Sequence, residues 1–187
     1  STPLNFVTKG TASALDNDFI EFVLSKEGQA ILKTVGYTVL DENADPYVKK
    51  NNMSGTISIM PNTGNNSIGY IEAIMSQLTA AYTAIYPDVT FKIFERDANS
   101  GYNGDLLRVD GTNYTLGISN RDLIPAEEGK NLNVTNVAKS YIDVFNNDNH
   151  DIFRISWYEG KIVEKISAEK YADIISNTAL AALANNK

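Results

Sequence analysis

The segments TISIM (56–60), SIGYIEAIMSQLTAAYTAIYP (67–87), VTFKI (89–93) and YTLGI (114–118) decide the fold. The longest of them carries apolar residues at helical spacing, in one continuous stripe: Ile68, Ile71, Met75, Leu78, Tyr82 and Ile85. The other three are short and apolar, which is typical of buried or half-buried strands. A short helix is expected at residues 105–109. This strand–helix–strand–helix–strand order predicts a three-layer α/β fold, a mostly parallel sheet with helices on both faces.

A second block lies upstream of this unit. Residues 4–8 predict a short strand, and a helical run follows it. Ser25 has the features of a new N-cap, which predicts that the helix bends or restarts there, and Gly36 is expected to end it. Residues 37–40 are expected to be extended. Residues 41–53 are the most polar stretch, so we interpret them as a surface connector between the two blocks.

The C-terminal third is less strongly patterned. A loop containing Pro and Glu is expected beyond Asp122, and it precedes strands near residues 140–145, 152–158 and 161–163. Ser167 is expected to cap a final helix, residues 168–184.

Composition excludes several classes of function. The 187 residues include no cysteine and one histidine, His150, which excludes disulfides, thiolate zinc sites and any mechanism that needs two imidazoles. A formal net charge of −7 disfavours binding to nucleic acid. No stretch reaches the roughly 18 apolar residues of a membrane span. We therefore expect no metal, no cofactor and no nucleic-acid partner.

Two polar loops are candidates for anion binding. Residues 62–67 follow the first predicted strand of the unit, and residues 99–104 follow the second. Both are rich in Gly, Ser, Thr and Asn, and both precede a helix, whose free backbone N–H groups favour anions. The alternative is that they are simply turns and helix caps, which need the same residue types.

Two groups of short segments carry a family resemblance. The first comprises residues 54–59 (SGTISI), 84–89 (AIYPDV), 99–101 (NSG) and 117–123 (GISNRDL). The second comprises residues 3–10 (PLNFVTKG), 19–29 (FIEFVLSKEGQ) and 36–37 (GY). The first group resembles the opening, and the second the closing segment, of the phosphate-binding substrate proteins of ABC transporters. That family has the type 2 periplasmic-binding-protein fold.

The resemblance implies one lobe of that fold, in a permuted order. Residues 3–40 resemble the family's C-terminal segment and residues 54–123 its N-terminal segment, joined by the connector 41–53. In the family both ends of the chain belong to the same lobe, so residues 1–187 are expected to form a single α/β lobe, with 124–187 as its unplaced remainder. A cut across tandem modules and a natural permutation both explain the order.

The resemblance also implies binding residues. Ser100 and Gly101 match the family's Gly-Ser-Gly turn, and Thr63 and Ser67 fall in the first loop. Thr115 stands where the family often has an aspartate that accepts the proton of hydrogen phosphate. We therefore expect Thr63, Ser67, Ser100, Gly101 and Thr115 to line an oxyanion site.

The function implied is non-catalytic binding of inorganic phosphate or a similar oxyanion for an ABC permease. The protein would then lie outside the cytoplasm, at the cell surface or in the periplasm, anchored to the membrane through its parent protein. A second lobe or tandem module is a further expected partner. The alternatives are a degenerate lobe that acts as a structural or protein-interaction module, and an enzyme, which only isolated residues support.

Other motifs have simpler interpretations. The polar stretch around His150 is interpreted as a solvated turn rather than a metal loop. Ser167 and Lys170 match a serine acyl-enzyme motif but are interpreted as a helix cap and an exposed lysine. Glu127 and Glu128 are interpreted as part of a solvated loop. For Arg96, a surface ion pair and an anion clamp remain equally open.

Overall fold

The computed structural model describes residues 3–34, 37–62, 68–94, 105–138, 141–145, 152–156 and 162–166. The helices are α1 (Ala14–Leu24), α2 (Lys26–Thr34), α3 (Ile68–Ile85) and the single 3₁₀ turn η1 (Leu106–Arg108). The strands are β1 (Leu4–Lys9), β2 (Gly55–Asn62), β3 (Val89–Ile93), β4 (Leu116–Ser119), β5 (Leu132–Ala138), β6 (Tyr141–Phe145), β7 (Ile152–Ser156) and β8 (Ile162–Ile166).

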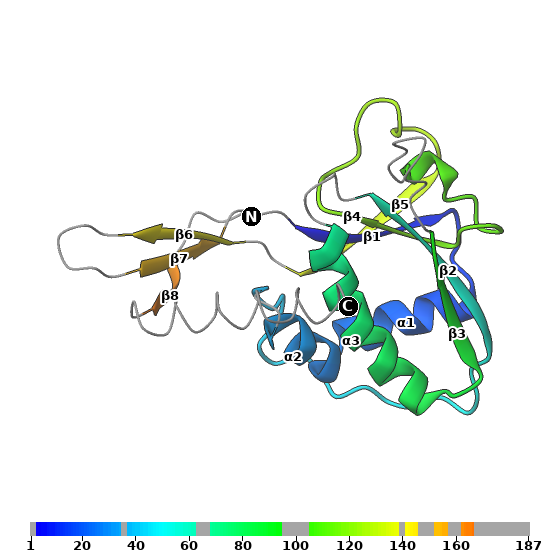
Figure 1. Ribbon diagram of the computed structural model, residues 1–187, viewed down its shortest axis with the longest axis horizontal. Coiled ribbons are helices and arrows are strands. Elements are labelled where there is room, and N and C mark those ends of the chain that lie inside the picture. The colour runs from blue at the N-terminus through cyan, green and yellow to red at the C-terminus, as the bar shows by residue number, and fades with distance from the viewer. Residues whose placement is uncertain are drawn as a thin grey trace.

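Five strands form one mixed sheet in the order β3-β2-β4-β1-β5 (Figure 1). Strand β2 is parallel to both β3 and β4, whereas β1 is antiparallel to both β4 and β5. The N-terminal strand therefore lies inside the sheet built by the central unit. Strands β6, β7 and β8 form a separate antiparallel sheet. The predicted α/β class is confirmed, with β1 adding antiparallel pairs to the expected parallel ones.

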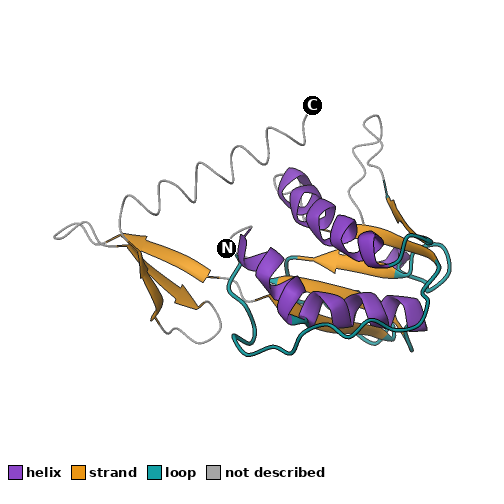
Figure 2. Cartoon of the chain, turned by 90° about the horizontal axis from the view of Figure 1, so that it is seen from below, coloured by secondary structure: helices purple, strands orange, loops and turns teal. Residues whose placement is uncertain are grey.

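The main core lies between the sheet and the three α-helices. Figure 1 shows α1, α2 and α3 together below β1 and β4, and Figure 2, seen from below, draws the helices in front of the strands. Phe19 of α1 is at the centre, with its ring centroid 5.9 Å from that of Phe6, 5.1 Å from Tyr82 and 4.9 Å from Phe91. Met75, Leu78 and Tyr82 of the predicted α3 stripe are buried. The helical pattern thus identifies the face of α3 that packs on the sheet.

A smaller cluster covers the opposite face of the sheet. Val7 of β1 and Met60 of β2 pack there against Leu106 and Val109 at η1. Gly117 of β4 makes this close approach possible, because an added Cβ would lie 2.8 Å from Leu106 and 2.9 Å from Val109. Among the described residues, this face therefore carries the 3₁₀ turn in place of a longer helix, and the predicted helix at 105–109 is shortened to that turn.

The break between α1 and α2 is where the sequence predicts it. Ser25 ends α1, and its hydroxyl accepts a hydrogen bond from the Gly28 backbone N–H at 3.3 Å. The same hydroxyl donates to the Phe22 carbonyl at 2.5 Å. These contacts satisfy backbone groups at both helix ends, so Ser25 restarts the helix as expected.

One segment differs from expectation. The prediction of a loop between Asp122 and residue 140 is wrong for residues 132–138, which form β5 along the outer side of β1. Residues 37–40, expected to be extended, contribute an isolated bridge at Thr38. The predicted final helix, residues 168–184, lies outside the described residues.

Candidate functional site

Three parallel strands direct their carboxyl ends to the same edge of the sheet. Ile59 of β2 lies opposite Ile93, the last residue of β3, and Asn62, the last residue of β2, lies opposite Ser119, the last residue of β4. Ligands of open α/β sheets bind at such an edge, beyond the ends of the strands. We call this side of the sheet the carboxyl edge.

Most predicted binding residues follow these strands in the chain. Thr63 and Ser67 lie between β2 and α3, and Ser100 and Gly101 lie between β3 and η1. All four lie outside the described residues, and so do Arg96, His150, Ser167 and Lys170. Their predicted roles stay predictions.

Thr115 is within the described residues, at the opposite end of β4. Its hydroxyl donates to Asp16 Oδ1 at 3.0 Å, and its backbone N–H donates to the Ser58 carbonyl at 2.9 Å. Asp16 also accepts a hydrogen bond from the Ser13 hydroxyl, the N-cap of α1, at 2.6 Å. At about 3.3 Å per residue, Thr115 lies about 13 Å along the strand from Ser119. The structure therefore joins Thr115 to the start of α1.

Four polar side chains form a row at the carboxyl edge. Strand registers place them opposite one another in the order Asn62, Ser119, Asn5 and Asn136, across β2, β4, β1 and β5. They lie on the face opposite the helices, because the alternate residues of β1 and β4 belong to the core beneath the helices. We call these four residues the polar row. The row is uncharged, so the edge offers neutral donors and acceptors.

Hydrogen bonds join the polar row to the turn after β4. Asn136 Nδ2 donates to Asn5 Oδ1 at 2.8 Å, and Asn5 Nδ2 donates to the Arg121 carbonyl at 3.3 Å. The Ser119 hydroxyl donates to that same carbonyl at 3.0 Å and accepts from the Arg121 N–H at 3.2 Å. Asn5 and Ser119 are both buried. These bonds hold the backbone of residues 119–121 at the carboxyl edge.

Arg121 itself is paired with a buried carboxylate. Its Nη1 lies 2.7 Å from Glu127 Oε1, and its Nη2 lies 3.0 Å from Glu127 Oε2, a two-point ion pair. The Ile124 N–H donates to the same carboxylate at 3.0 Å. The guanidinium lowers the pKa of Glu127 below its usual value of 4.5. The interpretation of Glu127 as part of a solvated loop is wrong, since its side chain is 2% exposed.

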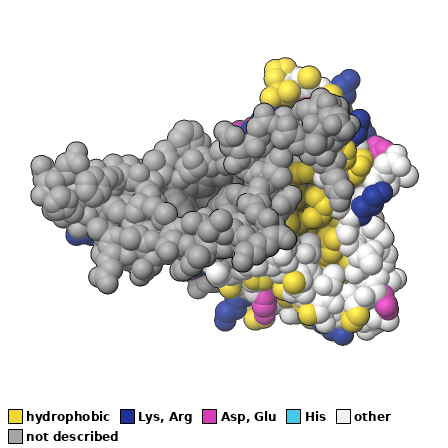
Figure 3. Space-filling model, viewed as in Figure 1, with side chains coloured by type: hydrophobic (Ala, Val, Ile, Leu, Met, Phe, Trp, Pro, Cys, Tyr) yellow, Lys and Arg dark blue, Asp and Glu magenta, His cyan; other side chains and the backbone are white. Residues whose placement is uncertain are grey.

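Charged side chains do not gather on the described part of the face shown in Figure 3. In Figure 3, the described part of that face shows basic and acidic side chains scattered singly, and hydrophobic side chains over the loop between β4 and β5 at the top. The same part of the chain contains no group of three or more His, Asp or Glu side chains that could hold a metal ion. The uncharged side chains that the edge offers an anion are those of the polar row.

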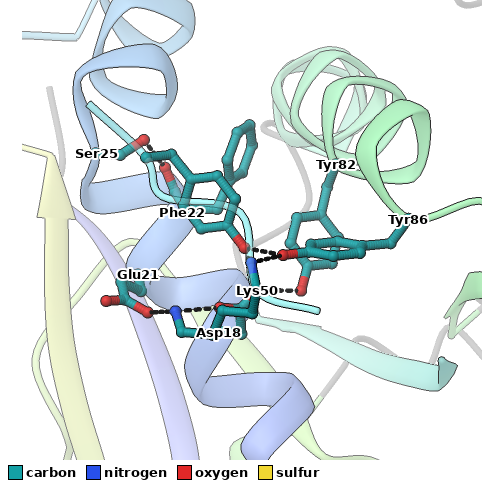
Figure 4. Close-up of polar contacts among 8 residues, drawn as sticks. Asp18, Glu21, Phe22, Ser25, Lys50, Tyr82 and Tyr86 are labelled. Carbon is teal, nitrogen blue, oxygen red and sulfur yellow. Dashed lines mark hydrogen bonds and ion pairs between the residues drawn. The ribbon is translucent and has the colours of Figure 1, made fainter. Parts of the chain in front are cut away.

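A second polar cluster, which the sequence did not indicate, lies between α1 and α3 (Figure 4). Asp18 of α1 accepts hydrogen bonds from the hydroxyls of Tyr47 at 2.5 Å and Tyr82 at 2.7 Å, and from Lys50 Nζ at 2.6 Å. The Tyr86 hydroxyl lies 2.6 Å from that of Tyr47 and accepts from the Lys50 backbone N–H at 2.8 Å. We call these five residues the Asp18 cluster. It fastens the connector 41–53 to both helices.

Burial and hydrogen bonding have opposite effects on the pKa of Asp18. Burial raises its pKa, but the hydrogen bonds from Lys50, Tyr47 and Tyr82 outweigh burial, so the pKa lies below 3.8. Burial and the Asp18 carboxylate both raise the pKa of Tyr82 and of Tyr47. At neutral pH the cluster is therefore an ionised carboxylate that accepts hydrogen bonds from two neutral tyrosine hydroxyls and from the Lys50 ammonium.

Comparison with known proteins supports the family resemblance. The chain is 29% identical over 175 residues to phosphate-binding protein PstS 2 of Streptococcus agalactiae, covering 93% of this chain and 56% of that protein. It is 30% identical over 148 residues to phosphate-binding protein PstS 2 of Streptococcus pneumoniae, covering 79% of this chain and 47% of that protein. No protein-family model matches the chain. The resemblance to phosphate-binding substrate proteins of ABC transporters is thereby confirmed.

A solved structure supports the fold. The chain superimposes on a phosphate-binding protein of a phosphate ABC transporter from Streptococcus pneumoniae with a TM-score of 0.57 and 28% sequence identity. The superposition covers 73% of this chain and 49% of that one. The chain thus spans about half the length of the relatives it matches. Within the described residues, no helix has the length and apolar character that crossing a membrane would require.

Proposed function

We propose that this chain binds an oxyanion without transforming it, and that the anion is inorganic phosphate. It would do so as part of the solute-binding protein of an ABC transporter. The observation that carries the proposal is its similarity to phosphate-binding proteins at 28–30% identity, in both sequence and fold. The names of these relatives favour ligand binding over a purely structural lobe or an enzyme.

The carboxyl edge is where we place the anion. Residues 63–67 and 95–104 come directly after β2 and β3 in the chain, and they contain the predicted binding residues Thr63, Ser67, Ser100 and Gly101. Backbone N–H groups and hydroxyls there would replace the water around the anion. Such neutral donors explain how a chain with a net charge of −7 could bind phosphate.

The proposal includes partners and a location. The complete protein would deliver phosphate to an ABC permease, from the cell surface or the periplasm, and would be anchored to the membrane through its parent chain. A second lobe or tandem module would close over the anion, because sites for small ligands bury 70–90% of the ligand surface. One lobe would cover the anion from one side only. We therefore expect this chain alone to bind phosphate with a dissociation constant in the millimolar range or weaker.

A phosphate titration of the full chain tests the proposal. NMR spectroscopy suits it because chemical-shift changes report weak binding. Ser100→Ala is expected to reduce the phosphate response at least several-fold, since it removes a hydroxyl donor from a site built of few donors. Ser76→Ala, at an exposed position of α3, is the matched control and is expected to respond as wild type does.

Two results would contradict the proposal. One is a wild-type chain whose spectrum does not change with phosphate. The other is a Ser100→Ala variant that keeps the full response, which would favour a lobe retained for structure or protein interaction. A micromolar or tighter constant would instead contradict the expectation that a single lobe binds weakly.

A further inference from the structure

Arg121 is the first cation after the carboxyl end of β4. Its backbone is bonded to Ser119 and Asn5 of the polar row. A guanidinium in this place would ordinarily attract an oxyanion, because it presents a fork of N–H donors and a full positive charge.

The positive charge of Arg121 is paired with a carboxylate of the protein itself. Both terminal nitrogens bind the Glu127 carboxylate, and Nη1 also donates to the Asp122 carbonyl at 2.9 Å. The Glu127 side chain is 2% exposed, against 34% for Arg121, so the pair is shielded from water mainly on the carboxylate side. Glu127 and, through space, Asp105 raise the pKa of Arg121. The cation therefore faces two negative charges.

We propose that Glu127 is a specificity-determining residue of the carboxyl edge, acting by neutralising Arg121. The site then selects its anion through neutral hydrogen-bond donors and not through a net positive charge. This inference rests on the proposed function, because it assigns a determinant of selectivity to that site. The Arg121–Glu127 pair also closes the turn of residues 121–127, whose first residue is hydrogen-bonded through its backbone to Asn5 and Ser119 of the polar row.

Glu127→Gln tests the inference. Glutamine keeps the size of the side chain and an acceptor for the Ile124 N–H, but it removes the carboxylate charge that is paired directly with Arg121. We expect the variant to bind inorganic phosphate and sulfate about tenfold more tightly than wild type at low salt, and to distinguish the two anions less well. Glu128→Gln is the matched control, since Glu128 is the exposed neighbour of Glu127.

The readouts are thermal stabilisation by each anion and its salt dependence. An anion that binds only the folded chain raises the melting temperature. For Glu127→Gln, the gain should disappear as added chloride shortens the screening length from about 30 Å at 0.01 M to about 3 Å at 1 M. The Arg121→Gln/Glu127→Gln double variant should respond like wild type, because it has the same net charge at the edge.

The outcomes separate this inference from the proposed function. A Glu127→Gln variant that gains no anion response relative to wild type overturns the inference even if wild type binds phosphate. A gain in Glu127→Gln over a wild type that shows none supports the inference and contradicts the proposed function for this chain. If Glu127→Gln does not fold, the salt dependence of the anion response of the wild-type chain tests the inference instead. A weak salt dependence of the wild-type response supports neutralisation, and a steep one overturns it.

Discussion

At the scale of single residues, the hydroxyl of Thr115 illustrates how position decides role. The family resemblance predicts that Thr115 binds the anion. In the structure, its hydroxyl donates a hydrogen bond to Asp16 in the first turn of α1. We expect Thr115→Val to lower the free energy of unfolding by about 1 kcal/mol, the usual value of one hydrogen bond, and to leave the phosphate response unchanged. Denaturant unfolding and a phosphate titration check this prediction.

The opposite result would support the prediction that Thr115 is a ligand. In that case the variant would lose its phosphate response while keeping wild-type stability. Val is the suitable replacement because it preserves the shape of the side chain and removes only the hydroxyl.

At this scale, the burial of charged side chains was the feature least predictable from the sequence. Glu127 lies in a polar stretch that is typical of solvated surface, and the residues around Asp18 do not indicate its partners, yet both side chains are buried in the structure. Their partners explain the difference. Arg121 is six residues from Glu127, and Tyr82 is 64 residues from Asp18. Only the folded chain brings these groups together, so local composition does not indicate them.

At the scale of elements, the junction between α1 and α2 depends on Gly28. A Cβ at this position would lie 2.3 Å from the Phe22 carbonyl oxygen and 2.4 Å from that of Val23. Both are backbone atoms, so the two helices would have to move apart. We expect Gly28→Ala to lower the free energy of unfolding by about 3 kcal/mol.

Thermal or denaturant unfolding measures this effect, and Lys33→Ala in the same helix is the control. Lys33 is exposed and pairs with Glu42 at 3.8 Å, a contact worth less than about 1 kcal/mol. A Gly28→Ala variant as stable as Lys33→Ala would mean that the helix junction is looser than the structure shows.

Elements with a strong local pattern were predictable, whereas β5 was not. The start and end of α3 follow from its apolar stripe and the proline at position 87, and the break at Ser25 follows from local capping. Strand β5 contains three polar residues, Asn133, Thr135 and Asn136, within seven positions. It is a strand because β1, more than 120 residues away, pairs with it. Long-range pairing of this kind leaves little local signal.

At the scale of the whole molecule, the Asp18 cluster joins the N-terminal block to the rest of the fold. It connects α1, the connector 41–53 and α3 through one carboxylate. Because the pKa of Asp18 is lower in the folded chain than its ordinary value of 3.8, the unfolded chain binds more protons between those two values. The stabilisation from Asp18 is therefore present above about pH 4 and is lost as pH falls through the folded pKa.

Asp18→Asn is expected to reduce the free energy of unfolding at pH 7 by about 2 kcal/mol and to flatten its fall below about pH 4. Denaturant unfolding from neutral to acid pH measures both effects. Asp45→Asn, which changes an exposed carboxylate of the connector, is the control and should keep the wild-type profile. An Asp18→Asn profile parallel to that of wild type would contradict the role of this cluster.

The measurement that tests the account most directly is a residue-resolved NMR titration of the full chain with inorganic phosphate. We expect the amide signals of Asn62, Asn120 and Arg121, at the ends of β2 and β4, to shift with a dissociation constant in the millimolar range. Signals around Asp18, on the helix side of the sheet, should remain unchanged. Shifts confined to the helix side, or a carboxyl edge that does not respond to phosphate, would contradict the account.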